Sequence, residues 1–159
     1  MTNRFDITRV RLKHYRSIAK CDVRLGALTL LVGPNGSGKS NFLDSFRLTS
    51  QALTENLDNA LRERGGIGEV RRRSRGHPTH FRISVDFRMG QSSGSYLFEV
   101  GAVKGGDYRV SHEECVVWHP DVSSPVDLLG DFTQMQQHYF TVDEGVVAST
   151  EPVMPSPSP

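Results

Sequence analysis

The chain has 159 residues, of which 36% are apolar and 23% are charged, and its formal net charge at pH 7 is +1. This length and composition are those of one soluble folded domain, and the near-neutral charge excludes a global basic field that draws proteins onto nucleic acid or anionic lipid. No apolar run approaches the roughly 18 residues of a membrane span and the N-terminus is too polar for a secretory signal, so we expect a cytoplasmic protein without membrane contact.

The N-terminal third of the sequence predicts strands followed by a loop and a helix. Apolar and polar residues alternate from Phe5 to Leu12, which is typical of a strand with one buried face, and residues 21–25 predict a second strand. Residues 27–32, with the sequence ALTLLV, are almost wholly apolar. Such a run is typical of a strand that is covered on both faces.

Helical spacing follows the glycine-rich segment Gly33–Gly38. Apolar residues between Ser40 and Leu48 recur mostly at the spacing of a helix. A second helix is predicted from about Leu53 to Arg64, with Gly65 and Gly66 as its end. The order of elements is therefore strand, loop, helix.

The second half of the sequence predicts an antiparallel meander at about residues 80–118. Three segments have strand character and are separated by short glycine turns. We assign residues 1–118 to one lobe and treat 119–150 as an uncertain connecting region, with one short helix near residues 134–139. Residues 151–159 are rich in proline and serine, which predicts a disordered tail. The three strand segments of the predicted meander are Phe81–Met89, Tyr96–Val103 and Tyr108–Trp118.

A phosphate-binding motif is the strongest functional signal in the sequence. The segment GPNGSGKS at residues 33–40 matches G-x-x-x-x-G-K-[ST] at every fixed position. Glycines allow successive N–H groups to point at phosphate oxygens, and the following helix adds the partial positive charge of its N-terminus. Lys39 would bridge the β- and γ-phosphates, and the Ser40 hydroxyl would bind Mg²⁺. The predicted nucleotide-binding residues are Gly33, Pro34, Asn35, Gly36, Ser37, Gly38, Lys39, Ser40 and Asn41, with Lys39 also catalytic and Ser40 the metal ligand.

The alternative interpretation of this segment is a glycine-rich turn with a solvated lysine. The context favours phosphate binding, because the motif follows a predicted buried strand and opens a predicted helix. We therefore expect the chain to bind ATP with Mg²⁺.

The first part of the chain resembles AAA-type ATPases related to RecF, SMC and Rad50 proteins, within the wider ABC-ATPase group. The resemblance rests on the segment Lys13–Ile18, which is similar to the aromatic-Arg-Ser segment of that group, on the phosphate loop, and on the continuation Asn41–Asp44. It covers roughly residues 5–118. It implies an α/β fold, a P-loop NTPase lobe of ABC/SMC type with an antiparallel β-subdomain beside the core sheet.

The same resemblance implies how such a lobe works. In that group two lobes bind ATP between them head to tail, and closure of the dimer acts on DNA or controls an attached nuclease or toxin. It further implies that Asn35 lies near the γ-phosphate and that Arg16 approaches the nucleotide or DNA. An exposed arginine at a strand end is the alternative for Arg16.

Several catalytic motifs of that group are absent from the sequence. The Walker B strand, an apolar run that ends in Asp-Glu, has no counterpart, because the sequence before Asp143-Glu144 is too short and too polar. No signature motif or switch histidine follows. The candidates for the glutamine that senses Mg²⁺ in that group are Gln134, Gln136 and Gln137. We therefore expect an incomplete ATPase, in which hydrolysis requires missing sequence or a partner chain.

These observations lead to one main hypothesis and two alternatives. The main hypothesis is an ATP-binding RecF/SMC-like domain in a DNA-related process such as repair or phage defence, acting as a homodimer or with a complementing ATPase chain. The alternatives are a non-catalytic module for nucleotide sensing or assembly and an inactive truncated fragment. A further hypothesis is that the arginines between residues 62 and 75 contact DNA, and its alternative is a solvated or partner-facing loop. These arginines are Arg62, Arg64, Arg71, Arg72, Arg73 and Arg75.

Overall fold

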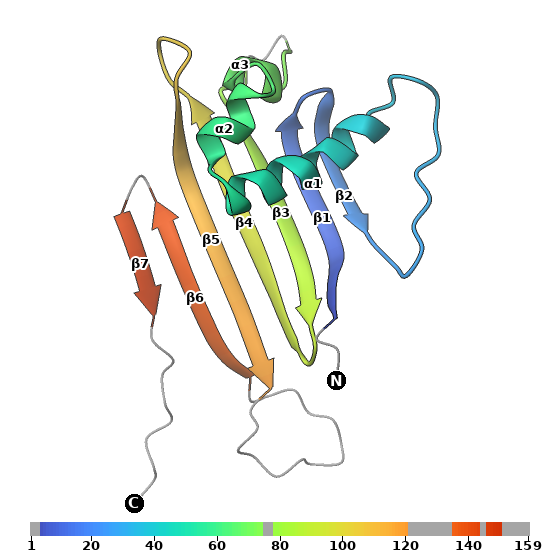
Figure 1. The fold of residues 1–159 in the computed structure, drawn as a ribbon, viewed down its shortest axis with the longest axis vertical. Coiled ribbons are helices and arrows are strands. Elements are labelled where there is room, and N and C mark those ends of the chain that lie inside the picture. The colour runs from blue at the N-terminus through green and yellow to red at the C-terminus, as the bar shows by residue number, and fades with distance from the viewer. Residues whose placement is uncertain (1–3, 75–77, 121–134, 144–145, 151–159) are drawn as a thin grey trace, which may run out of the picture.

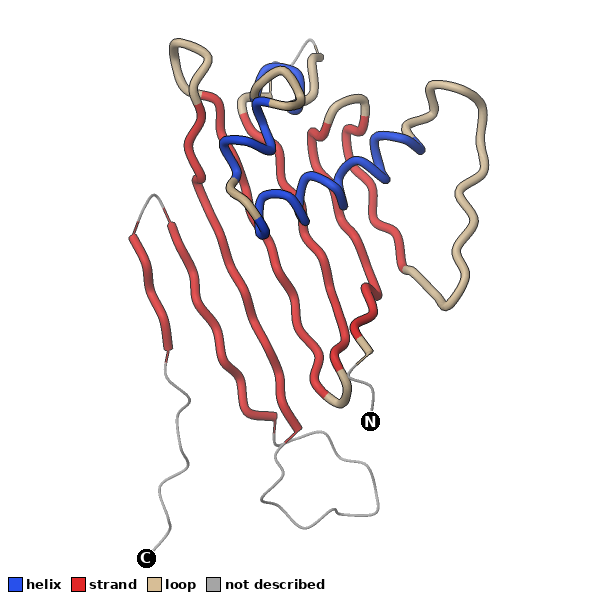
Figure 2. Tube along the Cα trace, in the orientation of Figure 1, coloured by secondary structure: helices blue, strands red, loops and turns tan. Residues whose placement is uncertain are grey.

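The computed structural model describes residues 4–74, 78–120, 135–143 and 146–150. In these residues one antiparallel sheet carries three helices on one face (Figures 1 and 2). The strand order is β2-β1-β3-β4-β5-β6-β7. The elements are β1 (Phe5–Tyr15), β2 (Ile18–Arg24), α1 (Lys39–Thr54), α2 (Leu57–Arg62), α3 (Ile67–Val70), β3 (His80–Met89), β4 (Ser92–Ala102), β5 (Tyr108–Pro120), β6 (Met135–Asp143) and β7 (Val146–Thr150).

The core lies between the helices and the strands β1, β3 and β4. In β1, Val10 and Leu12 are buried, and their register partners Val85 and Ile83 of β3 are buried beside them. Residues that face each other across antiparallel strands share a side of the sheet, so the alternation in the sequence produces one continuous apolar face. α1 packs its buried residues, Phe42, Ser45, Leu48 and Thr49, toward this face.

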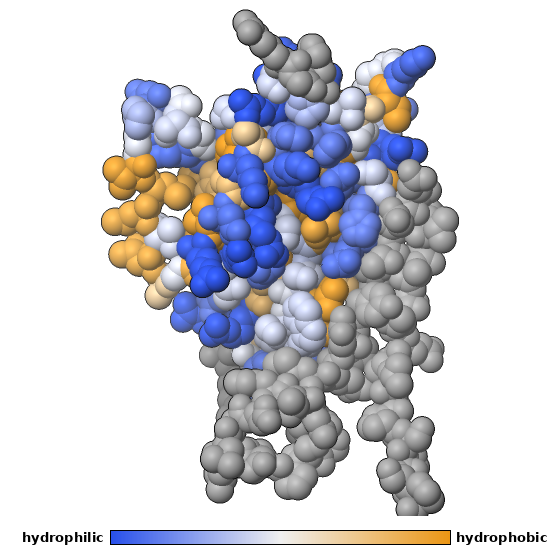
Figure 3. Space-filling model, turned by 180° about the vertical axis from the view of Figure 1, so that it is seen from behind, coloured by the Kyte–Doolittle hydropathy of each residue, from blue (hydrophilic) through white to orange (hydrophobic). Residues whose placement is uncertain are grey.

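The opposite face of the sheet is polar. Figure 3 shows hydrophilic side chains across its middle. Cross-strand ion pairs join Arg9 to Asp22 at 2.6 Å and Arg82 to Glu99 at 2.7 Å. Arg11 of β1 also pairs with Asp86 of β3. Half-exposed pairs of this kind contribute little to stability, so burial on the helix side is the main support of the sheet.

The segment 27–32 is not a buried strand, and this prediction is wrong. It is a loop between β2 and α1, and Leu28, Leu30 and Val32 are 79%, 75% and 90% exposed. The loop runs apart from the sheet in Figure 1, and hydrophobic side chains project at the same edge in Figure 3. An apolar run forms a buried strand only where neighbouring strands and helices cover it, and no described strand pairs with this segment.

The helices differ from the prediction in their boundaries. α1 continues to Thr54, and the predicted helix from Leu53 to Arg64 is replaced by the shorter α2. α2 begins after Asn56, whose side-chain oxygen accepts a hydrogen bond from the backbone N–H of Asn59 at 2.8 Å. An asparagine in this position is a strong N-cap, which explains the new start. The glycine end was predicted correctly, because Gly66 N–H donates to the Leu61 carbonyl after the last turn.

The meander is confirmed and is larger than predicted. β3, β4 and β5 pair in sequence, and β1 and β2 join the same sheet through β3, so the described strands form no separate β-subdomain. The predicted short helix at 134–139 is wrong where the structure describes it, because residues 135–143 form β6 against β5. Long-range pairing overrides the local preference there. The predicted tail at 151–159 lies outside the described residues.

Candidate nucleotide-binding site

The motif at residues 33–40 forms an exposed loop that leads into α1. Gly36 and Gly38 have φ angles of 81° and 97°. These values lie in the left-handed region, which residues with a Cβ rarely adopt. The motif therefore places glycine where the backbone turns, as phosphate binding requires.

The N-terminus of α1 is available to an anion. Gly38 is the N-cap, it provides no side-chain hydrogen bond, and the first turn contains no acidic residue. The first N–H groups of a helix have no partner within the helix and carry the positive end of its dipole. In a helix of 16 residues this end is a favourable place for phosphate oxygens.

Lys39 folds back over the loop. Its Nζ donates to the carbonyl oxygens of Gly33 at 2.6 Å and Pro34 at 2.8 Å, and it lies 3.4 Å from Ser37 Oγ. The cation is thus held at the centre of the loop by neutral oxygens. A phosphate group provides a charged acceptor that forms a stronger hydrogen bond with the same ammonium.

An open cavity of about 530 Å³ adjoins the loop. It is lined by residues 36–39 of the loop, residues 17–21 and Val23 of the β1–β2 hairpin, Phe42 of α1, and residues 30–32 of the apolar segment. This volume is within the range of small-molecule sites. The hydrogen-bond donors of the loop and of the start of α1 therefore lie at one side of a cavity in the size range of small-molecule sites.

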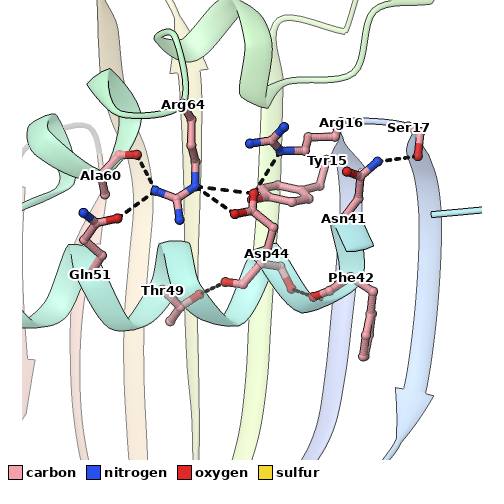
Figure 4. Close-up of polar contacts among 11 residues, drawn as sticks. Tyr15, Arg16, Ser17, Asn41, Phe42, Asp44, Thr49, Gln51, Ala60 and Arg64 are labelled. Atoms are coloured by element: carbon pink, nitrogen blue, oxygen red, sulfur yellow. Dashed lines mark hydrogen bonds and ion pairs between the residues drawn. The ribbon is translucent and has the colours of Figure 1, made fainter. Parts of the chain in front are cut away.

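The turn between β1 and β2 holds the start of α1. Asn41 Nδ2 donates to Ser17 Oγ at 2.7 Å, as Figure 4 shows. A Cβ on Gly38 would lie 3.4 Å from Ile18 Cγ1 and 3.5 Å from Ser17 Oγ. The turn therefore lies in close contact with the last glycine of the loop.

Asp44 of α1 is a polar centre that the sequence analysis did not identify. It accepts a hydrogen bond from the Tyr15 hydroxyl at 2.7 Å and forms ion pairs with Arg16 at 2.9 Å and Arg64 at 3.2 Å (Figure 4). Burial, followed by the contact with Asp44, raises the pKa of Tyr15, so this hydroxyl stays a donor. No local sequence pattern indicates this centre, because its members come from three separate segments.

Arg16 is placed by this centre. The resemblance implies that it approaches the nucleotide or DNA, whereas its guanidinium lies against Asp44. The contact is an ion pair without hydrogen-bond geometry. Arg16 therefore contacts the phosphate-loop helix through a carboxylate in this structure.

Most of the arginines between residues 62 and 75 contact groups of their own chain. Arg62 pairs with Asp58, Arg64 with Asp44 and Arg73 with Glu69, and Arg71 donates to the Pro78 carbonyl. Arg75 lies outside the described residues. These contacts satisfy much of the local positive charge, and the DNA contact stays a prediction.

The described residues considered for hydrolysis lie in β6, which is separated in the sheet from β2, the strand before the loop, by β1, β3, β4 and β5. Asp143 ends β6, and its register partners in the sheet are His112 of β5 and Val146 of β7. The register partners of Gln136 and Gln137 are His119 and Trp118 of β5. Gln134 and Glu144 lie outside the described residues. Among the described residues no group of three His, Cys, Asp or Glu side chains forms a metal site, so a Mg²⁺ ion would depend on Ser40 and on the phosphates themselves.

The comparison with known families agrees with this geometry. Residues 28–113 match the family model described as AAA domain, putative AbiEii toxin, type IV TA system, which is more than half of the chain. The chain belongs to this family of AAA domains. No curated protein matches the sequence.

The assignment places the AAA domain among P-loop ATPases, a class that uses nucleotides and usually Mg²⁺. The glycine-rich motif at residues 33–40 and all of α1, α2 and α3 lie inside the matched residues, as do β3 and β4. In the part of this AAA domain that the structure describes, no helix has the length and apolar character of a membrane span.

Proposed function

We propose that the chain is the nucleotide-binding lobe of a RecF/SMC/Rad50-like ATPase and that it binds MgATP through residues 33–40. The observation that carries the proposal is the loop at the N-terminus of α1, with unpaired N–H groups and Lys39 beside a cavity of about 530 Å³. The match to AAA domains supports the same class of ligand. The RecF/SMC/Rad50 subgroup is supported by the aromatic-Arg-Ser segment and by its contact with α1.

The proposal gives specific roles to residues of the loop and to Asn41, which follows it. The backbone at Gly36 and Gly38 turns so that N–H groups meet the phosphates, and Lys39 exchanges its carbonyl contacts for the β- and γ-phosphates. The Ser40 hydroxyl binds Mg²⁺, and Asn35 lies near the γ-phosphate. Asn41 holds the loop to Ser17.

The lobe is proposed to be completed by other sequence, in a second copy or in a complementing chain. Leu28, Leu30 and Val32 expose an apolar run directly before the phosphate loop. Exposure of apolar side chains to water is unfavourable in free energy, and a neighbouring strand with its helices would cover them and remove this unfavourable term. The groups that hydrolysis needs, a metal-binding carboxylate and a group that positions water, would come with the completing part.

A nucleotide-sensing or assembly role is the second candidate. It is favoured by the same observations, since the described residues contain a phosphate loop and an apolar docking segment without a clustered set of acidic residues beside them. The family description names a type IV toxin–antitoxin system, so control of an attached effector by nucleotide is the setting we propose for this role. Repair and phage defence are the alternative settings for the ATPase.

Calorimetric titration with MgATP tests the proposal. Wild-type protein is expected to bind saturably, and Lys39→Ala is expected to weaken binding about tenfold or more, which equals a free-energy change of ~1.4 kcal/mol or more. Lys104→Ala is the matched control, because Lys104 is an exposed lysine in the turn between β4 and β5. A folded wild-type chain that does not bind MgATP would contradict the proposal for the chain alone.

Turnover separates the two candidates. ATP hydrolysis by the purified chain, abolished in Lys39→Ala, would refute the sensing role. Binding without turnover, restored to turnover only when a second chain is added, would support completion by a partner.

A further inference from the structure

Three side chains converge on Asp44, one turn beyond the phosphate loop: Tyr15 and Arg64 donate hydrogen bonds to it, and Arg16 forms an ion pair with it. Tyr15 comes from the end of β1, Arg16 from the β1–β2 turn, and Arg64 from the segment after α2. Arg64 also donates to Gln51 Oε1 at 2.8 Å and to the Ala60 carbonyl at 2.7 Å. In Figure 4 these side chains approach α1 from the side that carries Asp44. One carboxylate therefore joins α1 to two other parts of the domain, the β1–β2 hairpin and the segment after α2.

These contacts are shielded from water to different degrees. The Tyr15 residue is 0% exposed, the Arg64 side chain 9%, the Asp44 side chain 21% and the Arg16 side chain 30%. Ion pairs and hydrogen bonds in such partly buried positions are less screened by solvent than surface pairs. The network is therefore a stronger tether than the exposed pairs elsewhere on the domain.

A second tether acts on the same part of α1. Asn41 is bound to Ser17, and residues 41 and 44 are three positions apart, so they lie on neighbouring surface of the helix. The buried residues of α1, such as Phe42 and Leu48, hold the helix to the sheet by apolar contacts. Apolar contacts are non-directional, whereas the two polar tethers set the rotation and the axial position of the first turns.

We propose that Asp44 is the positioning residue of the phosphate loop, and that Arg16 acts through Asp44 and is not a phosphate ligand. The proposal rests on the proposed function. Asp44 fixes the first turns of α1 against the β1–β2 turn, so that Lys39, Ser40 and the free N–H groups of the helix start are held in position before a nucleotide arrives. Pre-formed donors bind more tightly because less order has to be created on binding.

The direct-ligand alternative for Arg16 makes the opposite prediction. If Arg16 bound the phosphates, loss of the Asp44 carboxylate would release its guanidinium and leave MgATP affinity unchanged or higher. If Asp44 positions the loop, the same change lowers the affinity. The sign of the effect of Asp44→Asn therefore decides between the two.

The experiment combines calorimetry with hydrogen exchange of the nucleotide-free protein. Asp44→Asn is expected to weaken MgATP binding about tenfold and to speed exchange in residues 33–44, while the strands β3 and β4 stay protected. Asp58→Asn is the matched control, since Asp58 forms an exposed ion pair with Arg62 on α2, and it is expected to change neither quantity. If Asp44→Asn folds poorly, Arg16→Gln is the milder variant. It is expected to weaken MgATP binding and to speed exchange in residues 33–44 to a smaller extent. Arg16→Lys keeps the positive charge and is expected to restore part of both the affinity and the protection.

The outcomes separate this proposal from the proposed function. Failure of the wild-type chain to bind MgATP would overturn the proposed function, and the exchange measurement would still test whether Asp44 holds residues 33–44. Wild-type binding with equal or tighter binding by Asp44→Asn would overturn the role of Asp44. Uniform loss of protection in helices and strands alike would also overturn it, because Asp44 would then support the whole fold and not the loop.

Discussion

The ring of Phe87 occupies the position that a side chain on Gly94 would need. The two residues are register partners across β3 and β4, and a Cβ on Gly94 would lie 2.5 Å from Phe87 Cζ and 2.7 Å from the Val116 carbonyl oxygen. We predict that Gly94→Ala lowers the free energy of unfolding by about 1–3 kcal/mol, the usual cost of overpacking. Denaturant unfolding measures this change.

Gly101→Ala is the control for this prediction. Gly101 also lies in β4, and the nearest atom to its Cβ would be 4.0 Å away. Its substitution is expected to change stability by less than about 0.5 kcal/mol. Equal effects at the two positions would show that the Phe87 ring does not cover Gly94.

Backbone conformation at Gly36 is expected to matter for binding. Gly36 and Gly106 have φ angles of 81° and 86°, and no atom lies within 4 Å of the Cβ that alanine would add at either position. Substitution by alanine therefore introduces a similar backbone strain of about 1–2 kcal/mol at both. We predict that only Gly36→Ala weakens MgATP binding, measured by calorimetry, because Gly106 lies in the turn between β4 and β5. Equal affinities for both variants would argue against phosphate contact by the loop backbone.

The exposure of the segment 27–32 predicts an unusual tolerance to polar substitution. The double variant Leu28→Ser, Leu30→Ser is expected to change the free energy of unfolding by less than about 0.5 kcal/mol per site, since both side chains are already in water. Leu12→Ala, at a buried position, is expected to cost about 2–5 kcal/mol. The double variant should also self-associate less than the wild type, because it exposes less apolar surface, and analytical ultracentrifugation would detect the difference. A loss of stability as large as that of Leu12→Ala would mean that the segment is buried.

Stability is expected to fall in mild acid because of His14. Burial, followed by the nearby His80, Lys13 and Arg72, lowers the pKa of His14 below its ordinary value, and Nδ1 has no hydrogen-bond partner. A lowered pKa in the folded state means that the unfolded chain binds the proton more readily. This contribution to stability is therefore fully present above pH 6.5 and is lost as the pH falls through the lower folded-state value.

The variant His14→Asn checks this assignment. Asparagine tolerates the positive φ angle of 55° at this position better than most residues. Between pH 7 and pH 5 the unfolding free energy of the variant is expected to fall less steeply than that of the wild type. Parallel curves would assign the acid dependence to other groups.

The sequence pattern predicted those parts of the fold that depend on local alternation and on turn chemistry. β1, β3, β4 and β5 were found near their predicted positions, as was the glycine end at Gly65 and Gly66, because period-two burial and glycine turns are written in neighbouring residues. The run at 27–32 misled the prediction, since apolarity shows that a segment would gain from burial and not that a covering partner exists. β6 was missed because its pairing with β5 is distant in sequence.

The candidate site was predictable in the same uneven way. The residues 33–40 could be named because their chemistry requires fixed spacing, and the structure places them at the start of α1. Asp44 could not be named as a polar centre, because Tyr15 and Arg64 are 29 and 20 residues from it in sequence. Convergence of this kind is a property of packing, and no local pattern encodes it.

Val32 is followed directly by Gly33, so the exposed apolar run and the phosphate loop are one continuous piece of backbone. A strand that pairs with residues 27–32 would restrict the torsion angles at the entry to the loop and so change the affinity of the loop for phosphate. By thermodynamic linkage, a nucleotide in the loop would then change the affinity for that strand by the same factor. Binding of the partner strand and binding of the nucleotide would therefore be coupled through the continuous backbone at Val32 and Gly33, without any contact between the partner and the nucleotide.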